Sequence, residues 1–142
     1  MPVRSFQRLI VPASMLRAII DQARSEAPLE CCGILAGRTR EGIATAEVRY
    51  ALANEAASPT EFVSAARDMF AADRDMRRRG LELIAVYHSH PASHPVPSKT
   101  DLERNYSPSV VNIIVSLKTD PPEVKAWWLR NEGYTSAELT FE

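Results

Sequence analysis

An apolar segment that runs directly into two histidines is the feature that most constrains how this chain can fold. Residues 81–87 (LELIAVY) follow Gly80 and are rich in β-prone side chains, so they predict a buried strand. The strand leads into His88 and His90, and residues two apart on a strand project from the same face of a sheet. Their Cα atoms would lie roughly 6–7 Å apart, which allows both imidazole rings to reach one ion.

The segment after the histidines supplies two more residues at a defined spacing. Pro91, Pro95 and Pro97 stiffen a loop that cannot continue the strand. Ser98 and Asp101 are then typical of a helix N-terminus, with Ser98 as the N-cap and Asp101 near the third helical position. A loop that returns toward the strand would offer Asp101 to the same ion as the histidines.

Two neutral imidazoles and a carboxylate are ligands that a catalytic zinc uses, and they leave the fourth tetrahedral position to water. The sequence therefore predicts one zinc ion held by His88, His90 and Asp101. Each part of the pattern also has a purely structural interpretation. Ser98 with Asp101 is then a simple helix cap, and the histidines are surface residues at a strand end. The pattern does not need His94, which we expect to be a solvated loop residue.

The apolar periodicities and the Gly and Pro residues predict the order of secondary structure within a single domain, residues 1–142. A chain of this length, with 45% apolar residues, can bury a sizeable core. Mixed strands and helices predict an α/β fold with a curved sheet flanked by helices. Strands are expected at residues 6–11, 30–38, 43–52, 81–87, 110–117, 124–130 and 134–141, and helices from residue 14, at 64–79 and at 98–105.

Several large apolar side chains can be assigned to this fold. In the helix at 64–79, Met69 and Phe70 are expected to face the core. Near the C-terminus, Trp127, Trp128 and Tyr134 fit either the core or the surface of a homodimer, and the sequence leaves the two open.

The histidine pattern, with Ser89 between the two rings, resembles the signature of the JAMM (MPN+) metalloproteases, H-[ST]-H-x7-S-x2-D after a distant Glu. Residues 28–37 (PLECCGILAG) resemble the family's Pro-x-Glu-x-x-Gly segment and place the distant Glu at Glu30. Residues 54–59 (NEAASP), the helix after them and Trp127 resemble the bacterial branch, so the similarity covers nearly the whole chain.

This resemblance implies a fold and a chemistry. The fold would be the αβα sandwich of the MPN domains, which is related to that of the cytidine deaminases. The activity would be hydrolysis of a peptide or isopeptide bond, with Glu30 moving the proton of a zinc-bound water and Ser98 donating a hydrogen bond to the oxyanion. The substrate would be the C-terminal tail, often ending in Gly-Gly, of a ubiquitin-like or sulfur-carrier protein, from which some relatives release an amino acid such as cysteine.

Three alternatives belong to other classes of protein. The first is a non-catalytic binding module for a ubiquitin-like protein, but metal-free MPN domains generally lack part of the ligand set that this chain retains. The second is a thiol hydrolase that uses Cys31 or Cys32 with one of the histidines. The third is a nucleoside deaminase, which we set aside because the His-x-Glu and Pro-Cys-x-x-Cys signature is absent from the sequence.

Charge and composition bear on the partners and the compartment. The 18 acidic and 17 basic residues give a formal charge of −1, which argues against nucleic-acid binding driven by charge. Four arginines cluster where they complement the dipole at the end of the helix at 64–79, namely Arg74, Arg77, Arg78 and Arg79. The two adjacent cysteines would form a strained disulfide, and no apolar stretch is typical of a signal peptide or a membrane span. We therefore expect a cytoplasmic protein without a membrane partner.

Overall fold

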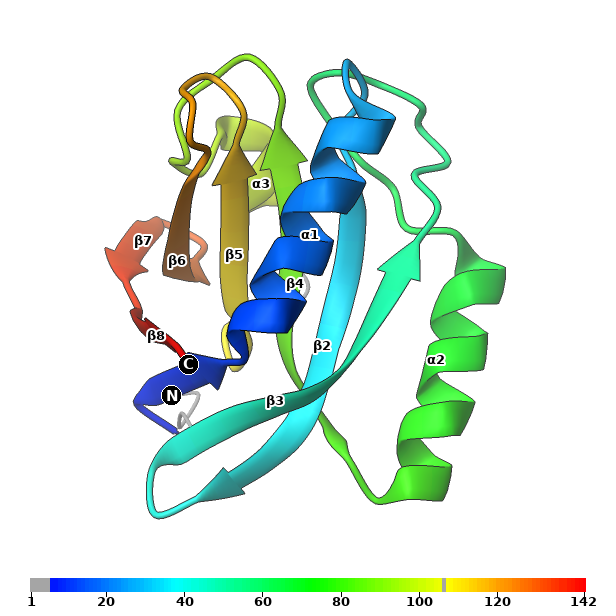
Figure 1. Cartoon of the computed structure of the whole chain (residues 1–142), viewed down its shortest axis with the longest axis vertical. Coiled ribbons are helices and arrows are strands. Elements are labelled where there is room, and N and C mark those ends of the chain that lie inside the picture. The colour runs from blue at the N-terminus through cyan, green and yellow to red at the C-terminus, as the bar shows by residue number, and fades with distance from the viewer. Residues whose placement is uncertain (1–5, 106) are drawn as a thin grey trace.

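The computed structural model describes residues 6–105 and 107–142, which form three helices and eight strands. The elements follow the predicted order, and most bounds lie close to those expected (Figure 1). In chain order they are β1 (Arg8–Val11), α1 (Ala13–Glu26), β2 (Cys32–Arg40), β3 (Ile43–Leu52), α2 (Ala66–Arg79), β4 (Glu82–His90), α3 (Lys99–Glu103), β5 (Val111–Ser116), β6 (Glu123–Arg130), β7 (Gly133–Ser136) and β8 (Glu138–Phe141). Within these described residues, no helix is both long and apolar enough to cross a membrane.

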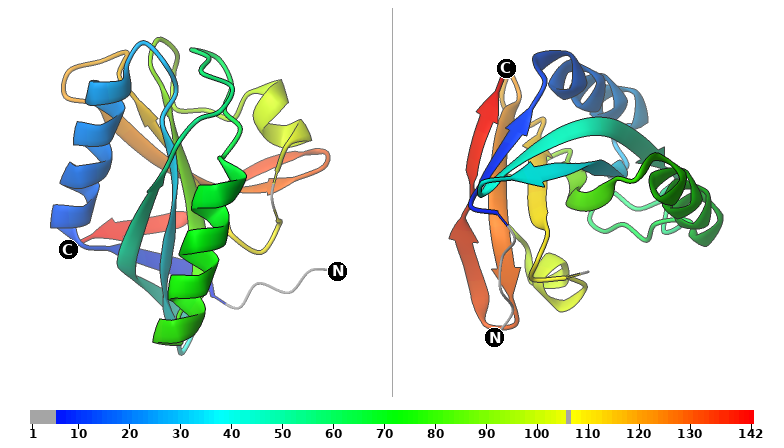
Figure 2. Two further views of the ribbon diagram at one scale, coloured as in Figure 1. Left: turned by 90° about the vertical axis from the view of Figure 1, so that its right-hand side faces the viewer. Right: turned by 90° about the horizontal axis from the view of Figure 1, so that it is seen from below.

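All eight strands belong to one mixed sheet, in the order β7-β6-β5-β4-β2-β3-β1-β8. The strand β4 is parallel to β5 and antiparallel to β2, while β1 is parallel to both β3 and β8. The consecutive strands β7 and β8 lie at opposite ends of this order, so the sheet curls back on itself until it is nearly a barrel (Figure 2). The prediction of a curved mixed sheet is confirmed.

The expectation of one final strand at residues 134–141 is wrong, because the chain changes partner at Ala137. Residues before it pair with β6, whereas residues after it pair with β1 at the other end of the sheet. The backbone N–H of Ala137 donates to the carbonyl of Ala126 on β6, at 2.9 Å, and marks the crossing point. The segment contains neither glycine nor proline, the residues that most often interrupt a strand, so the sequence gives no strong sign that the partner changes.

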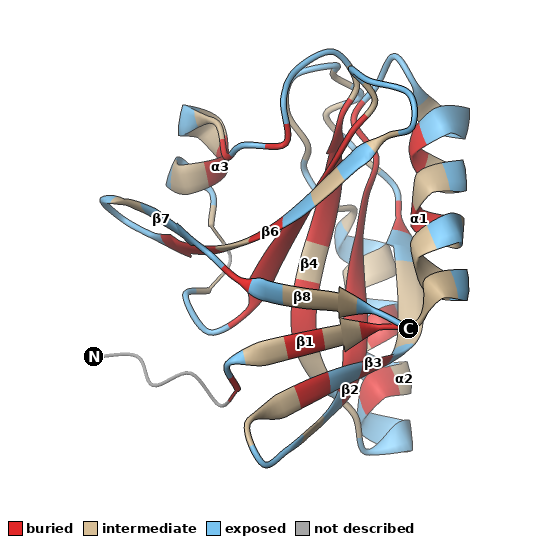
Figure 3. Ribbon diagram, turned by 60° about the vertical axis from the view of Figure 1, so that its left-hand side comes forward, coloured by how far each residue is buried: buried red, intermediate tan, exposed pale blue. Residues whose placement is uncertain are grey.

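Helices cover the sheet on both of its faces, which confirms the αβα arrangement. From below, α1 lies on one side of β2 and β3, and α2 lies on the other (Figure 2). Ile19 and Ala23 of α1 join a core cluster with Trp128, whereas Ala72 and Met76 of α2 join a second cluster on the opposite face. The central strands are buried between the two clusters, and the outer faces of the helices are exposed (Figure 3).

The expectation for α2 is confirmed for Met69 and wrong for Phe70. Met69 packs against the second core cluster together with Ala72 and Met76, which follow it by three and seven residues on one helix face. Phe70 is one position around the helix from this stripe, and 65% of its surface is exposed.

The adjacent cysteines face opposite sides of the sheet and are both free. Cys31 belongs to the first core cluster and Cys32 to the second, as expected for neighbours in extended backbone. Burial raises the pKa of Cys31 to about 11 and that of Cys32 to about 12. A thiolate nucleophile is therefore disfavoured at either position, and this argues against the thiol hydrolase.

A glycine on β2 lets the first core cluster close over the sheet. Tyr87 lies across Gly33. Its hydroxyl group donates a hydrogen bond to Oε1 of Gln22 in α1 and accepts one from the guanidinium group of Arg49 in β3. A Cβ atom on Gly33 would lie 2.1 Å from Cζ of Tyr87. The absence of a side chain at Gly33 therefore allows Tyr87 to link the sheet to α1.

We expect Gly33→Ala to lower the free energy of unfolding by about 1–3 kcal/mol, because the added methyl group must displace the Tyr87 ring. Chemical denaturation monitored by tryptophan fluorescence measures this change. Gly133→Ala is the matched control, since a Cβ there meets no atom within 4 Å, and it should change the value by less than about 0.5 kcal/mol. Equal effects of the two substitutions would contradict the role of Gly33.

Candidate metal centre

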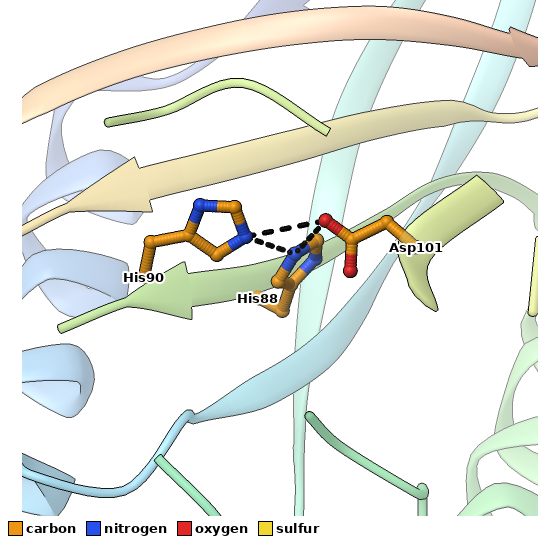
Figure 4. A group of neighbouring side chains, drawn as sticks. All are labelled: His88, His90 and Asp101. Carbon is orange, nitrogen blue, oxygen red and sulfur yellow. Dashed lines mark hydrogen bonds and ion pairs between the residues drawn. The ribbon is translucent and has the colours of Figure 1, made fainter. Parts of the chain in front are cut away.

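The three predicted ligands lie together on the face of the sheet that carries α2 and α3. His88 and His90 project from the end of β4, and Asp101 comes from the first turn of α3 (Figure 4). The Nε2 atoms of the two histidines are 3.1 Å apart, and each lies 3.2 Å from Oδ2 of Asp101. All three residues are buried.

This triangle of donor atoms fits a tetrahedral metal ion. Bonds of about 2.0–2.1 Å to a tetrahedral zinc place its ligand atoms roughly 3.3 Å from one another. The observed separations of 3.1 and 3.2 Å are close to this value. Two imidazoles and one carboxylate also match the donor types of zinc, so the residues present can hold such an ion.

A helix cap delivers the carboxylate of Asp101. The Oγ atom of Ser98 accepts a hydrogen bond from the backbone N–H of Asp101 at 3.0 Å, and the backbone N–H of Ser98 donates to Oδ2 of Asp101 at 2.9 Å. The prediction that Ser98 is an N-cap is confirmed. Because Oγ is the acceptor in this cap, its hydroxyl hydrogen remains available for another acceptor.

The loop between the histidines and Ser98 is fastened at several points. The indole N–H of Trp127 donates to the carbonyl of Pro95 at 2.9 Å, and the hydroxyl group of Ser116 donates to the carbonyl of Ser93. Trp128, in contrast, is buried in the first core cluster. The two tryptophans therefore differ in role, and Trp127 helps to set the path of the chain from His90 to Asp101.

Different contacts orient the two histidine rings. The Nδ1–H group of His90 donates a hydrogen bond to the carbonyl oxygen of His94, with Nδ1 and the oxygen 2.8 Å apart. This bond fixes the ring and directs Nε2 toward Asp101. The ring of His88 stacks on Phe62, with centroids 4.7 Å apart, and its buried Nδ1 has no hydrogen-bond partner among the described residues. The expectation that the His94 side chain is solvated is confirmed, but the sequence did not reveal the use of its carbonyl or of Phe62.

The protonation of these groups depends on burial and on their mutual contacts. Burial lowers the pKa of His88, which favours the neutral imidazole that a metal requires. Burial also acts to lower the pKa of His90, but the hydrogen bonds to Asp101 and to His94 outweigh it and raise this pKa. The pKa of Asp101 is lowered, because the bonds to both histidines outweigh the effect of its burial.

Glu30 lies on the same face, opposite His90 in the strand register. Cys32 of β2 pairs with His88 of β4, and Ser89 exchanges two hydrogen bonds with Cys31 through its backbone N–H and its Oγ. One further step along these antiparallel segments sets Glu30 across from His90. The charges of His90 and Asp101 both act on the Glu30 carboxyl group, consistent with this placement.

The carboxyl group of Glu30 is buried, and its Oε1 atom has no hydrogen-bond partner among the described residues. Burial raises its pKa to about 8, although the charge of His90 acts in the opposite direction. A buried carboxyl group with a strongly raised pKa beside a cluster of candidate ligands is characteristic of functional sites.

An apolar pocket of about 410 Å³ opens directly beside two of the candidate ligands. His88 and Asp101 form part of its wall, together with Phe62, Met69 and Val86. The pocket therefore places a mostly apolar cavity against the buried donor cluster.

Comparison with known proteins is consistent with this geometry. Residues 12–130 match the family Prok-JAB, the prokaryotic homologs of the JAB domain. A desampylase from Pyrococcus furiosus is 35% identical over 132 residues, which cover 93% of this chain and 89% of the relative. A CysO-cysteine peptidase from Mycobacterium tuberculosis is 31% identical over 113 residues, which cover 80% of this chain and 75% of the relative.

The solution structure of a protein from Desulfitobacterium hafniense has the same fold, with a TM-score of 0.86 and 29% identity over 94% of this chain and 92% of that one. This chain belongs to the family of prokaryotic JAB-domain homologs. The resemblance to the JAMM (MPN+) family that the sequence suggested is thereby confirmed.

For the metal centre, we expect the protein to bind one zinc ion per chain and His90→Ala to weaken this binding by at least about tenfold. Zinc titration followed by calorimetry measures the loss. The matched control is His94→Ala, which keeps the backbone carbonyl that orients His90 and should bind zinc as the wild type does. Loss of zinc in His94→Ala but not in His90→Ala would show that the ligand set is wrong.

For Glu30, we expect Glu30→Gln to stabilise the chelator-treated protein at alkaline pH. A carboxyl group whose pKa is higher in the folded chain destabilises the fold as the pH rises between the unfolded and folded values, here from 4.5 to about 8. Denaturant titrations should give Glu30→Gln an advantage on the order of 1–4 kcal/mol at pH 8 that shrinks below pH 5. A constant difference between the two proteins across this range would contradict the burial of an ionisable Glu30.

Proposed function

We propose that this protein is a zinc-dependent peptidase that cleaves a peptide or isopeptide bond at the C-terminal tail of a ubiquitin-like or sulfur-carrier protein. The observation that carries the proposal is the buried triangle of His88, His90 and Asp101, with the Glu30 carboxyl group on the same face. The relatives support the substrate class, since their names identify a desampylase and a CysO-cysteine peptidase.

A zinc ion, when bound, would polarise the scissile carbonyl group and acidify a water molecule. His88, His90 and Asp101 would hold the ion, and the contact of His90 with the His94 carbonyl keeps Nε2 directed inward. Glu30 accepts the proton of the attacking water and passes it to the leaving amine. Its Oε1 atom suits this role, because it has no competing hydrogen bond within the described part of the chain.

Ser98 has a second role in this proposal. Its Oγ atom accepts the hydrogen bond that caps α3, so its hydroxyl hydrogen is free to donate to the oxyanion that forms during attack. The same residue thus fixes the Asp101 carboxylate and stabilises the developing charge.

The substrate tail binds in an extended conformation, with its small Gly-Gly end beside the buried donor cluster. Glycine residues suit this position, because the metal ligands are almost completely covered and a larger side chain next to the scissile bond would collide with them. The apolar pocket beside His88 takes a side chain of the substrate that lies farther from the bond.

The proposal predicts that purified protein loaded with zinc releases a peptide or a single amino acid fused behind the Gly-Gly tail of a carrier protein. Chelation should abolish cleavage, and Glu30→Gln should lower kcat by about 10²–10⁴-fold while zinc remains bound. Mass spectrometry of the products and metal analysis measure both effects. Glu103→Gln is the matched control, since this exposed carboxylate in α3 is outside the donor cluster.

Two results would overturn the proposal. Activity that survives complete removal of zinc would exclude the mechanism, and so would normal turnover by Glu30→Gln. Stoichiometric binding of the carrier without cleavage would instead identify a non-catalytic module for a ubiquitin-like protein.

A further inference from the structure

The loop at residues 53–65, between β3 and α2, holds the backbone of Glu30 on both sides. The N–H of Glu30 donates to the carbonyl of Ser58 at 2.9 Å. The side-chain amide of Asn54 donates to the carbonyl of Glu30 at 3.0 Å. Glu30 precedes β2 and lies outside its ladder, so these two hydrogen bonds fix its backbone where the sheet does not.

The same Asn54 side chain organises the loop itself. Its Nδ2 group also donates to the carbonyl of Glu61 at 3.0 Å. Its Oδ1 atom accepts hydrogen bonds from the backbone N–H groups of Ala56 at 3.0 Å and of Val63 at 2.9 Å. One amide group thus makes four hydrogen bonds, and three of them are internal to the loop.

Two of these internal bonds hold the residues on either side of Phe62. Phe62 stacks on the ring of His88, and together with Val63 it lines the pocket beside the donor cluster. An ion pair between Arg104 and Glu61, with the nitrogen and oxygen 3.7 Å apart, connects the loop to the end of α3. Asn54 is therefore bonded both to Glu30 and to the wall of the pocket.

We propose that Asn54 is a positioning residue that sets the catalytic geometry of Glu30 and couples it to the pocket wall at Phe62. This inference rests on the proposed function of Glu30 as the proton carrier. The two hydrogen bonds to the loop fix the backbone from which the Glu30 side chain extends, and no described residue bonds to its Oε1 atom. A shift of about 1 Å in such a group can reduce catalysis about 100-fold.

The chemistry of the contacts requires an amide at this position. Asn54 must donate to two carbonyl groups and accept from two N–H groups at once, and a carboxylate of the same shape offers acceptors only. Asn54→Asp therefore retains the two bonds from the N–H groups of Ala56 and Val63. The two bonds to the carbonyl groups of Glu30 and Glu61 are lost, because a carboxylate oxygen faces and repels both carbonyl oxygens.

The experiment compares Asn54→Asp with Thr60→Ala in the zinc-loaded full chain. Asn54→Asp should lower kcat about 10–100-fold with zinc content nearly unchanged. KM should change far less than kcat, because the variant keeps the bond that holds Val63 in the pocket wall. Thr60→Ala is the matched control, because it removes an exposed hydroxyl group of the same loop that bonds to neither Glu30 nor Asn54. Its kcat should equal that of the wild type.

A double-mutant cycle separates positioning from general loosening of the fold. In a Glu30→Gln background, Asn54→Asp should cause no further loss of kcat, because its effect acts through the carboxylate that is already absent. A further loss equal to that in the wild-type background would overturn the proposal. A wild-type kcat in Asn54→Asp would overturn it as well.

A readout without turnover keeps this inference separate from the proposed function. In Asn54→Asp, amide hydrogen exchange at Glu30 should become faster than in the wild type, whereas in Thr60→Ala it should not change. Unchanged exchange in Asn54→Asp would overturn the positioning role, even if the wild type cleaves no carrier tail. If Asn54→Asp does not fold, Asn54→Ser, which replaces the amide by one hydroxyl group, takes its place in each measurement.

Discussion

One carboxylate oxygen, Oδ2 of Asp101, connects the stability of the fold to the proposed chemistry. It accepts the hydrogen bond that completes the cap of α3, at 2.9 Å from the N–H of Ser98, and it lies 3.2 Å from Nε2 of both His88 and His90. The short helix α3 is thereby fixed to the end of β4. A residue that begins a helix is held at a defined distance from two residues that end a strand, and this arrangement creates the donor triangle.

Beside this triangle, Glu30 has a backbone fixed by hydrogen bonds and a carboxyl oxygen without a hydrogen bond to any described residue. The backbone of Glu30 is held by Ser58 and Asn54, but its buried carboxyl group is held by no described residue at Oε1. Burial raises the pKa of this carboxyl group and lowers the stability of the fold when the group is ionised. Functional sites tolerate this cost, because a group that carries a proton must be held in place and still be able to exchange that proton. The metal that we propose would reduce this cost, since a cation opposes the effect of burial on a carboxyl group.

Much of the candidate site could be predicted because its signals are local. The strand before His88, the spacing of the histidines and the cap formed by Ser98 each depend on residues within a few positions of one another. Glu30 was found through family resemblance, since one glutamate in a sequence has no distinguishing pattern. The use of the His94 carbonyl and of Phe62 was not foreseen, because a backbone carbonyl carries no sequence signal and a stacking contact joins residues far apart in the chain.

The sequence by itself determined the type and order of most elements, since apolar periodicity, glycines, prolines and capping residues act within single segments. The tertiary structure alone decided which strands pair, where the last strand changes partner at Ala137, and that Phe70 faces solvent while Met69 packs inward. It also decided that residues 53–65 fold over Glu30. The physical reason is that pairing and packing depend on the shape and register of distant segments, which become defined only when the sheet has curled around its core.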